Sequence, residues 1–227
     1  MLALKQALSL VSTKVGGGAA WSPSDESSLE AWYKYKVGIT LNGSDVKSWQ
    51  DSAATGLYDM VQDTETEQPA YSAGALTFVS ANLENLQTTG QISLTGDFTL
   101  GLRINTSTTN GAFLADNTSS NEYFKYSSSS RISFKIAGST SNNLDLDSGT
   151  FGDDYIVITR LSDVLTLWKN GVAQSETSTV PGTSLIDVIG LRRPDGNAFD
   201  GTISEIQIYS SSDSILTSRI NARLSTL

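Results

Sequence analysis

The sequence predicts an all-β fold made of antiparallel strands, and the stretch from residue 155 to residue 209 provides the main evidence. Four runs of β-branched and aromatic residues, each of strand length, end there at Gly, Asn or Asp. Asn170-Gly171 separates two of these runs and supplies the positive φ angles that a tight hairpin turn needs. The two-residue period of a strand also recurs earlier, in the run that contains Phe98, Leu100, Leu102 and Ile104.

Shorter elements account for most of the preceding chain. An entry turn is expected around Pro23, then a first strand or a short helix at residues 29–33 and a polar loop at residues 38–45. A second polar loop is expected at residues 139–154. Strands are expected at residues 75–79, 85–88, 97–104, 113–115, 122–126 and 131–137.

The last third of the chain resembles a known family. A strand ending in Thr159-Arg160 precedes Leu-Thr-Leu-Trp-Lys-Asn-Gly, then a strand ending in Ile-Gly and the closing Phe-Asp-Gly-Thr-Ile-Ser-Glu-Ile-Gln-Ile-Tyr. This order resembles the concanavalin A-like lectin/glucanase superfamily and, within it, the laminin-G-like (LamG) jelly-roll domains. The resemblance is specific across residues 150–224 and looser across residues 28–104. It implies an antiparallel jelly-roll β-sandwich, although a fold alone does not name a function.

The resemblance also implies two local features. In the family the closing strand is followed by a polar stretch and a short helix, which residues 210–213 and 215–224 match. Val46, Trp49 and Asp51 resemble a family element in which the tryptophan lies in the core. Asp51 is then expected to bond to the turn that follows it.

Residues 1–20 read as an N-terminal arm with a glycine-rich hinge at residues 16–20, and residues 21–227 as the LamG-like domain. The arm suits either a helix or a strand, because its apolar residues fit both periods. It either adds a strand to its own domain or docks on a neighbouring subunit. The side chains expected to dock are Leu2, Leu4, Leu8, Leu10, Val11 and Val15.

Composition excludes several classes of function. The 227 residues have a net charge of −9 and a pI near 4.4, which argues against binding nucleic acid or anionic lipid. No run reaches the roughly 20 apolar residues that span a bilayer. With no Cys and no His, the sequence has no disulfide, no thiolate zinc site and no Ser-His or Cys-His nucleophile pair.

Two groups of carboxylates are candidates for chemical sites. Residues 63–67, Asp-Thr-Glu-Thr-Glu, share the spacing of the catalytic Glu-x-Asp-x-Glu strand of β-glucanases but not its order or its apolar flanks, so a loop is favoured. The aspartates at 145, 147, 153 and 154 suggest calcium, but without the spacing of a calcium loop they favour turn chemistry. We therefore expect no catalytic residue, no metal site and no cofactor, with calcium as the alternative.

Three functions follow in order of preference. The apolar arm, the glycine hinge and the single LamG-like domain resemble small accessory proteins of tailed-bacteriophage virions, which implies several copies bound to other virion proteins, on the capsid or on a tail, collar or fibre. With no signal peptide pattern, such a protein is expected to be made in the bacterial host cytoplasm and to reside in the virion.

The alternative is a carbohydrate-binding module for host-surface glycans. Its candidate aromatic residues are Trp21, Tyr58, Tyr71 and Tyr123. A glycoside hydrolase ranks last, and a buried glutamate with a raised pKa beside a tryptophan would favour it.

Overall fold

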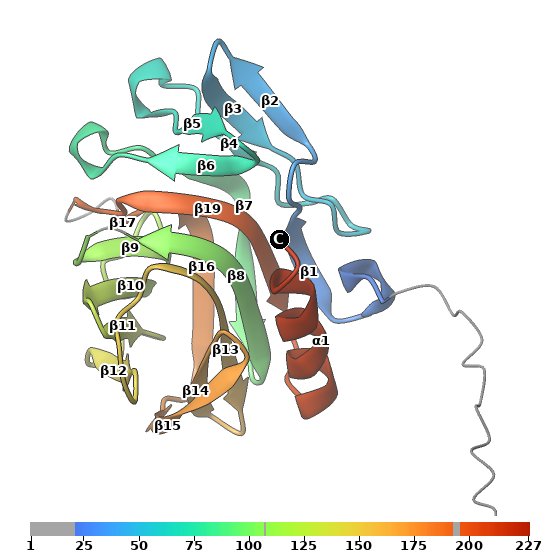
Figure 1. Ribbon diagram of the computed structural model, residues 1–227, viewed down its shortest axis with the longest axis vertical. Helices are drawn as coiled ribbons and strands as arrows, with labels where there is room; N and C mark the ends of the chain where they lie inside the picture. The colour runs from blue at the N-terminus through green and yellow to red at the C-terminus, as the bar shows by residue number, and fades with distance from the viewer. Residues whose placement is uncertain (1–20, 107, 193–195) are drawn as a thin grey trace, which may run out of the picture.

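The strand-forming runs of the sequence pair into two antiparallel layers that pack face to face, a jelly-roll β-sandwich with one short helix at its C-terminal end (Figure 1). The computed structural model describes residues 21–106, 108–192 and 196–227. The predicted arm and its six docking side chains lie outside these residues.

The back layer is centred on two long strands, β19 and β8, which pair along nearly their whole length. Strands β1 and β6 pair with opposite ends of β19, and β13, β14 and β15 follow β8 in that order. These strands are β1 (Leu29–Tyr33), β6 (Ala75–Phe78), β8 (Phe98–Thr106), β13 (Asp153–Leu161), β14 (Val164–Lys169), β15 (Val172–Thr179) and β19 (Gly201–Tyr209).

The front layer runs in the order β4, β7, β16, β9, β10, β11 and β12. Its strands are β4 (Met60–Val61), β7 (Leu86–Thr95), β9 (Gly111–Ala115), β10 (Tyr123–Ser128), β11 (Arg131–Lys135), β12 (Asn142–Asp145) and β16 (Thr183–Ile189).

Short elements close the ends of the sandwich. Strand β3 pairs with β4 and β5, and β5 pairs with β6, so the two layers are joined where β2 to β6 gather at the top of Figure 1. The remaining elements are β2 (Ile39–Asn42), β3 (Asp45–Trp49), β5 (Ala70–Ser72), β17 (Leu191–Arg192), β18 (Asn197–Ala198) and the 3-10 turns η1 (Pro23–Asp25), η2 (Glu65–Glu67) and η3 (Ser80–Asn82).

The core lies between the layers, as the alternation of apolar residues predicts. Phe98 of β8 meets Phe124 of β10 across the sandwich, with ring centroids 6.3 Å apart. Phe124 in turn stacks on Phe134 of β11 at 5.9 Å. Trp49 is fully buried, and Asp51 accepts a hydrogen bond from the backbone N–H of Ala53, so both expectations drawn from the family element are confirmed.

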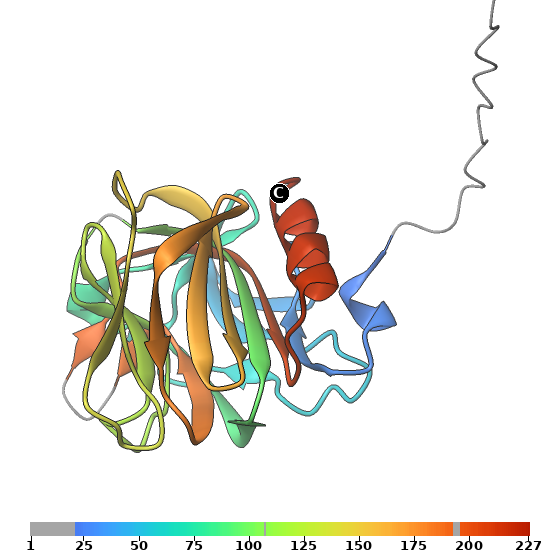
Figure 2. The same cartoon turned by 90° about the horizontal axis from the view of Figure 1, so that it is seen from below.

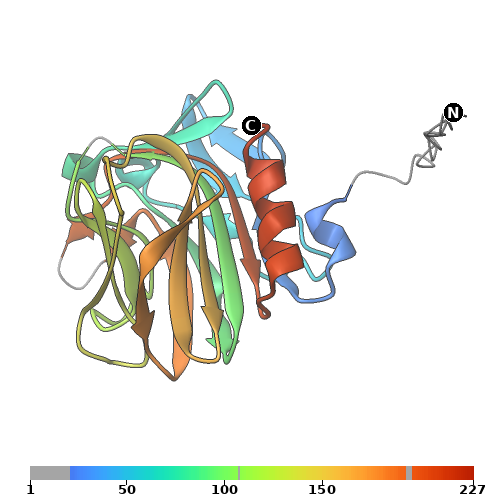
Figure 3. The same cartoon turned by 60° about the horizontal axis from the view of Figure 1, so that its bottom comes forward.

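The helix α1 (Ser214–Leu224) covers the outer face of the back layer, next to β8 and β13 (Figure 2). Asp213 caps it, because its carboxylate accepts hydrogen bonds from the N–H groups of Ile215 and Leu216. The turn η1 lies beside α1 on the same side of the molecule (Figure 3). The helix predicted at residues 215–224 is therefore confirmed.

Three expectations about local structure need correction. Residues 38–45 contain β2, and residues 139–154 contain β12 and the start of β13, so neither stretch is only a loop. In β12 one buried residue, Leu144, pairs opposite Ile132 and anchors a strand that is otherwise polar, which hid the strand from a composition argument. The strand expected at residues 85–88 continues to Thr95, because Ile92 and Leu94 are also buried. Within the described ranges, no helix is long and apolar enough to cross a bilayer.

Candidate functional site

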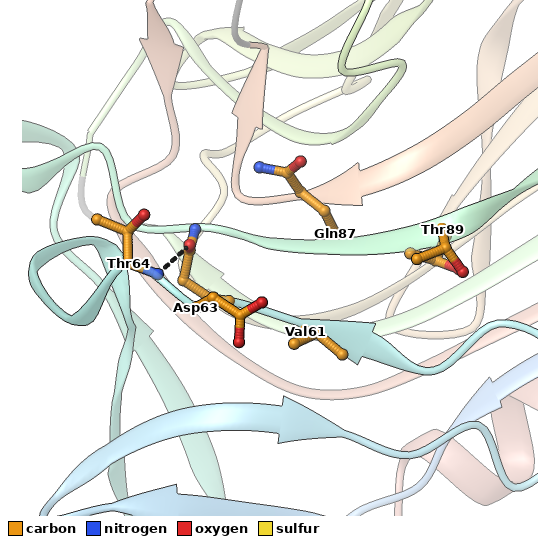
Figure 4. Close-up of a pocket in the computed structure, with 7 residues that line it drawn as sticks. Val61, Asp63, Thr64, Gln87 and Thr89 are labelled. Atoms are coloured by element: carbon orange, nitrogen blue, oxygen red, sulfur yellow. Dashed lines mark hydrogen bonds between the residues drawn. The ribbon is translucent and has the colours of Figure 1, made fainter.

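A hollow of about 590 Å³ lies over β7 and the end of β4 (Figure 4). Because Leu86 points into the core, Gln87 and Thr89 project from the other face of β7, where they border the hollow. Asp63 and Thr64 border it from the segment after β4. The volume falls in the range of roughly 300–1,000 Å³ that is typical of small-molecule sites.

A chain of side-chain amides joins the two sides of this hollow. The amide groups of Gln62 and Asn85 both donate to Oε2 of Glu67, at 3.3 and 3.2 Å. Gln87 donates to Oδ1 of Asn85 at 2.8 Å, and Asn117 donates to Oε1 of Gln87 at 2.9 Å. We call these five residues the amide network. Since each member is held by another, the network holds the side chains of the hollow in fixed positions.

Carboxylates extend the amide network over the front layer. Asp187 on β16 accepts a hydrogen bond from the backbone N–H of Asn117 at 2.6 Å, and Asp116 accepts one from Gln91 at 3.1 Å. Burial raises the pKa of the Asp187 carboxyl, and the nearby charge of Asp116 raises it further. Burial likewise raises the pKa of the Glu122 carboxyl. This part of the front layer therefore carries carboxylate acceptors next to the side-chain amides of the network.

The acidic run at residues 63–67 contributes to this site in a way the sequence does not reveal. It is a loop followed by the turn η2, so its carboxylates do not share one face of a strand. Asp63 borders the hollow, Glu65 accepts a hydrogen bond from Asn42, and Glu67 belongs to the amide network.

The four aspartates weighed for calcium all have hydrogen-bonding or ionic partners within the protein. Asp145 pairs with Arg131, Asp147 accepts from Ser175, Asp153 pairs with Arg103 and Asp154 accepts from Asn170. Across the residues that the structure describes, no group of three acidic side chains has the geometry of a metal site.

The four aromatic candidates are dispersed. Trp21 lies beside α1, where its Nε1 donates to Glu26. Tyr58 packs partly buried on the core beside β7, and Tyr71 packs on the core from β5. Tyr123 on β10 is only 4% exposed and lies under the guanidinium of Arg192 at 4.2 Å. None of the four borders the 590 Å³ hollow.

One buried glutamate does lie beside a tryptophan. Glu205 on β19 is fully buried and accepts a hydrogen bond from Nε1 of Trp32 at 3.0 Å. Its carboxylate also pairs with Arg223 of α1 at 2.6 Å, under the helix. The Glu205 carboxylate is thus enclosed by its partners and does not border a hollow of the described surface.

The sequence did not single out the amide network. Gln62, Asn85, Gln87 and Asn117 are ordinary polar residues in loops or on the polar side of a strand. Asn117 and Gln87 are 30 residues apart and meet only because β16 and β9 bring the loop after β9 close to β7.

No protein-family model matches this sequence, and no curated protein sequence matches it either. Solved structures do share its fold. Domain 4 of AbnA, a GH43 extracellular arabinanase from Geobacillus stearothermophilus solved in complex with arabinotriose, is 15% identical with a TM-score of 0.54, over 86% of this chain and 97% of that one.

Two further structures are similar over much of the chain. The binding domain of Paraclostridial Mosquitocidal Protein 1 is 11% identical with a TM-score of 0.51, over 90% of this chain and 53% of that one. The Trypanosoma rangeli sialidase in complex with the inhibitor DANA is 12% identical with a TM-score of 0.54, over 86% of this chain and 32% of that one. The chain thus spans about a third of the sialidase. These likenesses establish a lectin-like jelly-roll β-sandwich.

Proposed function

We propose that this chain is a noncatalytic carbohydrate-binding module whose hollow over β7 binds a neutral glycan. The amide network is the observation that supports the proposal most directly, because sugar hydroxyls are recognised by side-chain amides and carboxylates that are already fixed in place. The likeness to an arabinanase domain solved with arabinotriose adds weight to a glycan ligand, although it concerns that protein's ligand.

The chemistry of the hollow favours a ligand that donates hydrogen bonds. The amide nitrogen of Gln62 donates to Glu67 and to the carbonyl of Asn85, and that of Gln87 donates to Asn85. Each amide oxygen accepts one hydrogen bond, from Thr64 and Asn117 respectively, and keeps a second lone pair for a ligand. Asp63 adds a carboxylate, and none of the described residues that border the hollow is Lys or Arg. An uncharged sugar ring supplies hydroxyl donors here, while a uronic or sialic acid would bring a second negative charge.

A glycan array probed with the full chain, followed by titration calorimetry, tests this proposal. Neutral oligosaccharides are expected to bind and acidic ones to be excluded. Gln87→Leu removes both the donor to Asn85 and the acceptor for Asn117, so it is expected to weaken binding at least tenfold, since loss of about 1.4 kcal/mol lowers affinity tenfold.

A matched pair on β7 provides the control. Thr89 borders the hollow, whereas Thr95 lies farther along the same strand and bonds to Thr183. Thr89→Val is expected to reduce affinity and Thr95→Val to leave it unchanged. Equal affinities for both variants and the unaltered chain, or binding restricted to acidic glycans, would refute the assignment.

The noncatalytic part of the proposal has its own test. The fully buried Glu205 is covered by α1, and Glu67 is tied into the amide network, so Asp63 remains the accessible carboxylate of the hollow. Incubation with the glycans that bind is expected to release no new reducing ends. Release that Asp63→Asn abolishes would establish a hydrolase instead.

We propose as a second function that the module is carried on a bacteriophage virion, attached through residues 1–20. The supporting observation is in the sequence, where the apolar segment ending at Val15 is followed by Gly16-Gly17-Gly18. Deletion of residues 1–18 is expected to leave the sandwich folded and to abolish attachment to virion particles. Attachment that survives the deletion would contradict this role.

A further inference from the structure

A second hollow, of about 200 Å³, lies on the outer face of the back layer, on the other side of the sandwich from the amide network. It is an open depression bordered by β13, β14, the segment before α1 and the start of α1. Its wall combines the indole of Trp168 and the side chain of Leu161, which is 53% exposed, with the hydroxyl groups of Thr166, Ser212 and Ser214.

Trp168 is placed there by the alternation of β14. Leu165 and Leu167 point into the core, so Trp168 projects from the outer face, where it packs against the apolar side of α1. Its Nε1 is buried and has no hydrogen-bond partner among the residues that the structure describes. A buried indole N–H normally finds an acceptor, so the Trp168 donor is an exception in this part of the fold.

The hydroxyl groups around Trp168 divide into two kinds. Thr217 donates to the carbonyl of Asp213, and Thr159 donates to the carbonyl of Thr166, so both serve the local structure. The side chains of Thr166, Ser212 and Ser214 make no hydrogen bond within the described part of the chain. These three are therefore available to a ligand.

Charge and size narrow the ligand class. Among the described residues that border the hollow, Asp213 alone is charged, and its carboxylate already caps α1, so the helix end is not an anion site. The volume is below the roughly 300 Å³ at which sites for drug-sized ligands begin. A single sugar ring fits these features, since one face of the ring presents C–H groups and its rim presents hydroxyls.

We propose that the hollow at Trp168 is a second carbohydrate site, which takes one ring of a neutral glycan against the indole. The inference rests on the proposed carbohydrate-binding function but concerns separate residues in the opposite layer. With both sites occupied, one molecule bridges two glycan chains or two parts of one chain, and binding to a polysaccharide surface gains from this bivalency.

Nuclear magnetic resonance of the ¹⁵N-labelled chain tests the second site directly. The four tryptophans yield four indole N–H signals, and Trp168→Phe identifies the one that belongs to Trp168. Arabinotriose, xylotriose, cellotriose, maltotriose and laminaritriose serve as probes. Saturable movement of the Trp168 signal with at least one of them is expected, and absence of movement with all five overturns the proposal.

Two matched variants distinguish the loss of a contact with the ligand from a general effect of substitution on the protein. Thr166→Val removes a hydroxyl of the hollow and is expected to weaken the titration of the Trp168 signal about fivefold, the loss of one neutral hydrogen bond. Thr177→Val alters the residue paired with Thr166 on β15, which does not border the hollow, and is expected to have no effect. Equal titrations of the two variants overturn the assignment.

The first site is tested independently in the same experiment. In Gln87→Leu the Trp168 signal is expected to move as before, because Gln87 lies in the front layer. If the Trp168 signal stays still while the Gln87-dependent binding persists, the second site fails alone. If Trp168 responds and Gln87→Leu has no effect on overall binding, the hollow over β7 fails alone.

Discussion

The guanidinium of Arg223 on α1 forms a bidentate pair with the carboxylate of Glu205 on β19, at 2.6 Å from Nε to Oε1 and 2.8 Å from Nη2 to Oε2. Glu205 is fully buried and also accepts hydrogen bonds from Trp32 and Gln207. The helix that ends the chain is thereby fastened to the central strand of the back layer. A bidentate pair of this kind is strong because each oxygen meets its own donor.

Arg223→Ala is expected to lower the free energy of unfolding by about 3–5 kcal/mol, because it leaves the buried Glu205 without its cation. Urea unfolding followed by circular dichroism measures the loss. The control is Arg219→Ala on the same helix, where Arg219 is 46% exposed and pairs with Glu26. That change is expected to cost at most about 1 kcal/mol, and equal losses for the two variants would contradict the role given to Glu205.

The helix α1 packs closely over Gly101 on β8. A Cβ there would lie 2.5 Å from Cγ2 of Ile220 on the helix. Gly101→Ala is therefore expected to destabilise the protein by about 1–3 kcal/mol through overcrowding. In Gly152→Ala the added Cβ meets no atom within 4 Å, so that variant is expected to keep its melting temperature.

Arg160 joins the two layers through backbone carbonyls. It is fully buried at the end of β13, and its guanidinium donates to the carbonyls of Gly96, Gly182 and Leu94. Burial lowers the pKa of this guanidinium. Arg160→Lys keeps the charge but loses the planar set of donors, so we expect a loss of about 2–3 kcal/mol in stability.

The exposed Arg131 provides the comparison for Arg160. It bonds to the carboxylate of Asp145 at the surface. Arg131→Lys is expected to change the free energy of unfolding by less than about 0.5 kcal/mol. Chemical unfolding of the two variants side by side distinguishes a structural arginine from a surface one.

Asp187 is expected to make stability fall as the pH rises. Burial raises the pKa of its carboxyl above the usual 3.8, so the folded protein binds this proton more tightly than the unfolded chain does. The favourable contribution is complete below pH 3.8 and is lost as the pH passes through the raised value. Asp187→Asn removes this dependence, so its stability relative to the unaltered chain is expected to increase toward neutral pH in urea unfolding.

Asp145 is expected to behave in the opposite way. Its hydrogen bonds to Arg131 lower the pKa of the carboxyl below 3.8, so its contribution is present above that pH and is lost as the pH falls through the lowered value. The stability of Asp145→Asn relative to the unaltered chain is therefore expected to improve only in acid. The same slope in both variants would show that the two carboxyls are not shifted in opposite directions.

The sequence by itself determined the strands of the last third of the chain and the Asn170-Gly171 turn, because these depend on residues close together in the chain, whose side chains alternate with period two or complete a turn. The burial of Trp49 and the closing helix followed from the resemblance to the LamG-like domains. Where local signals were weak, as in the polar strand around Leu144, the sequence was misleading.

The tertiary structure alone decided which polar residues meet. Gln87 and Asn117 are 30 residues apart, and Glu205 and Arg223 are 18 apart, yet each pair is joined by hydrogen bonds. The hollow at Trp168 likewise needs β13, β14 and α1 together. Local periodicity predicts which face of a strand a side chain occupies. Its hydrogen-bonding partner on that face depends on the order in which distant strands pair.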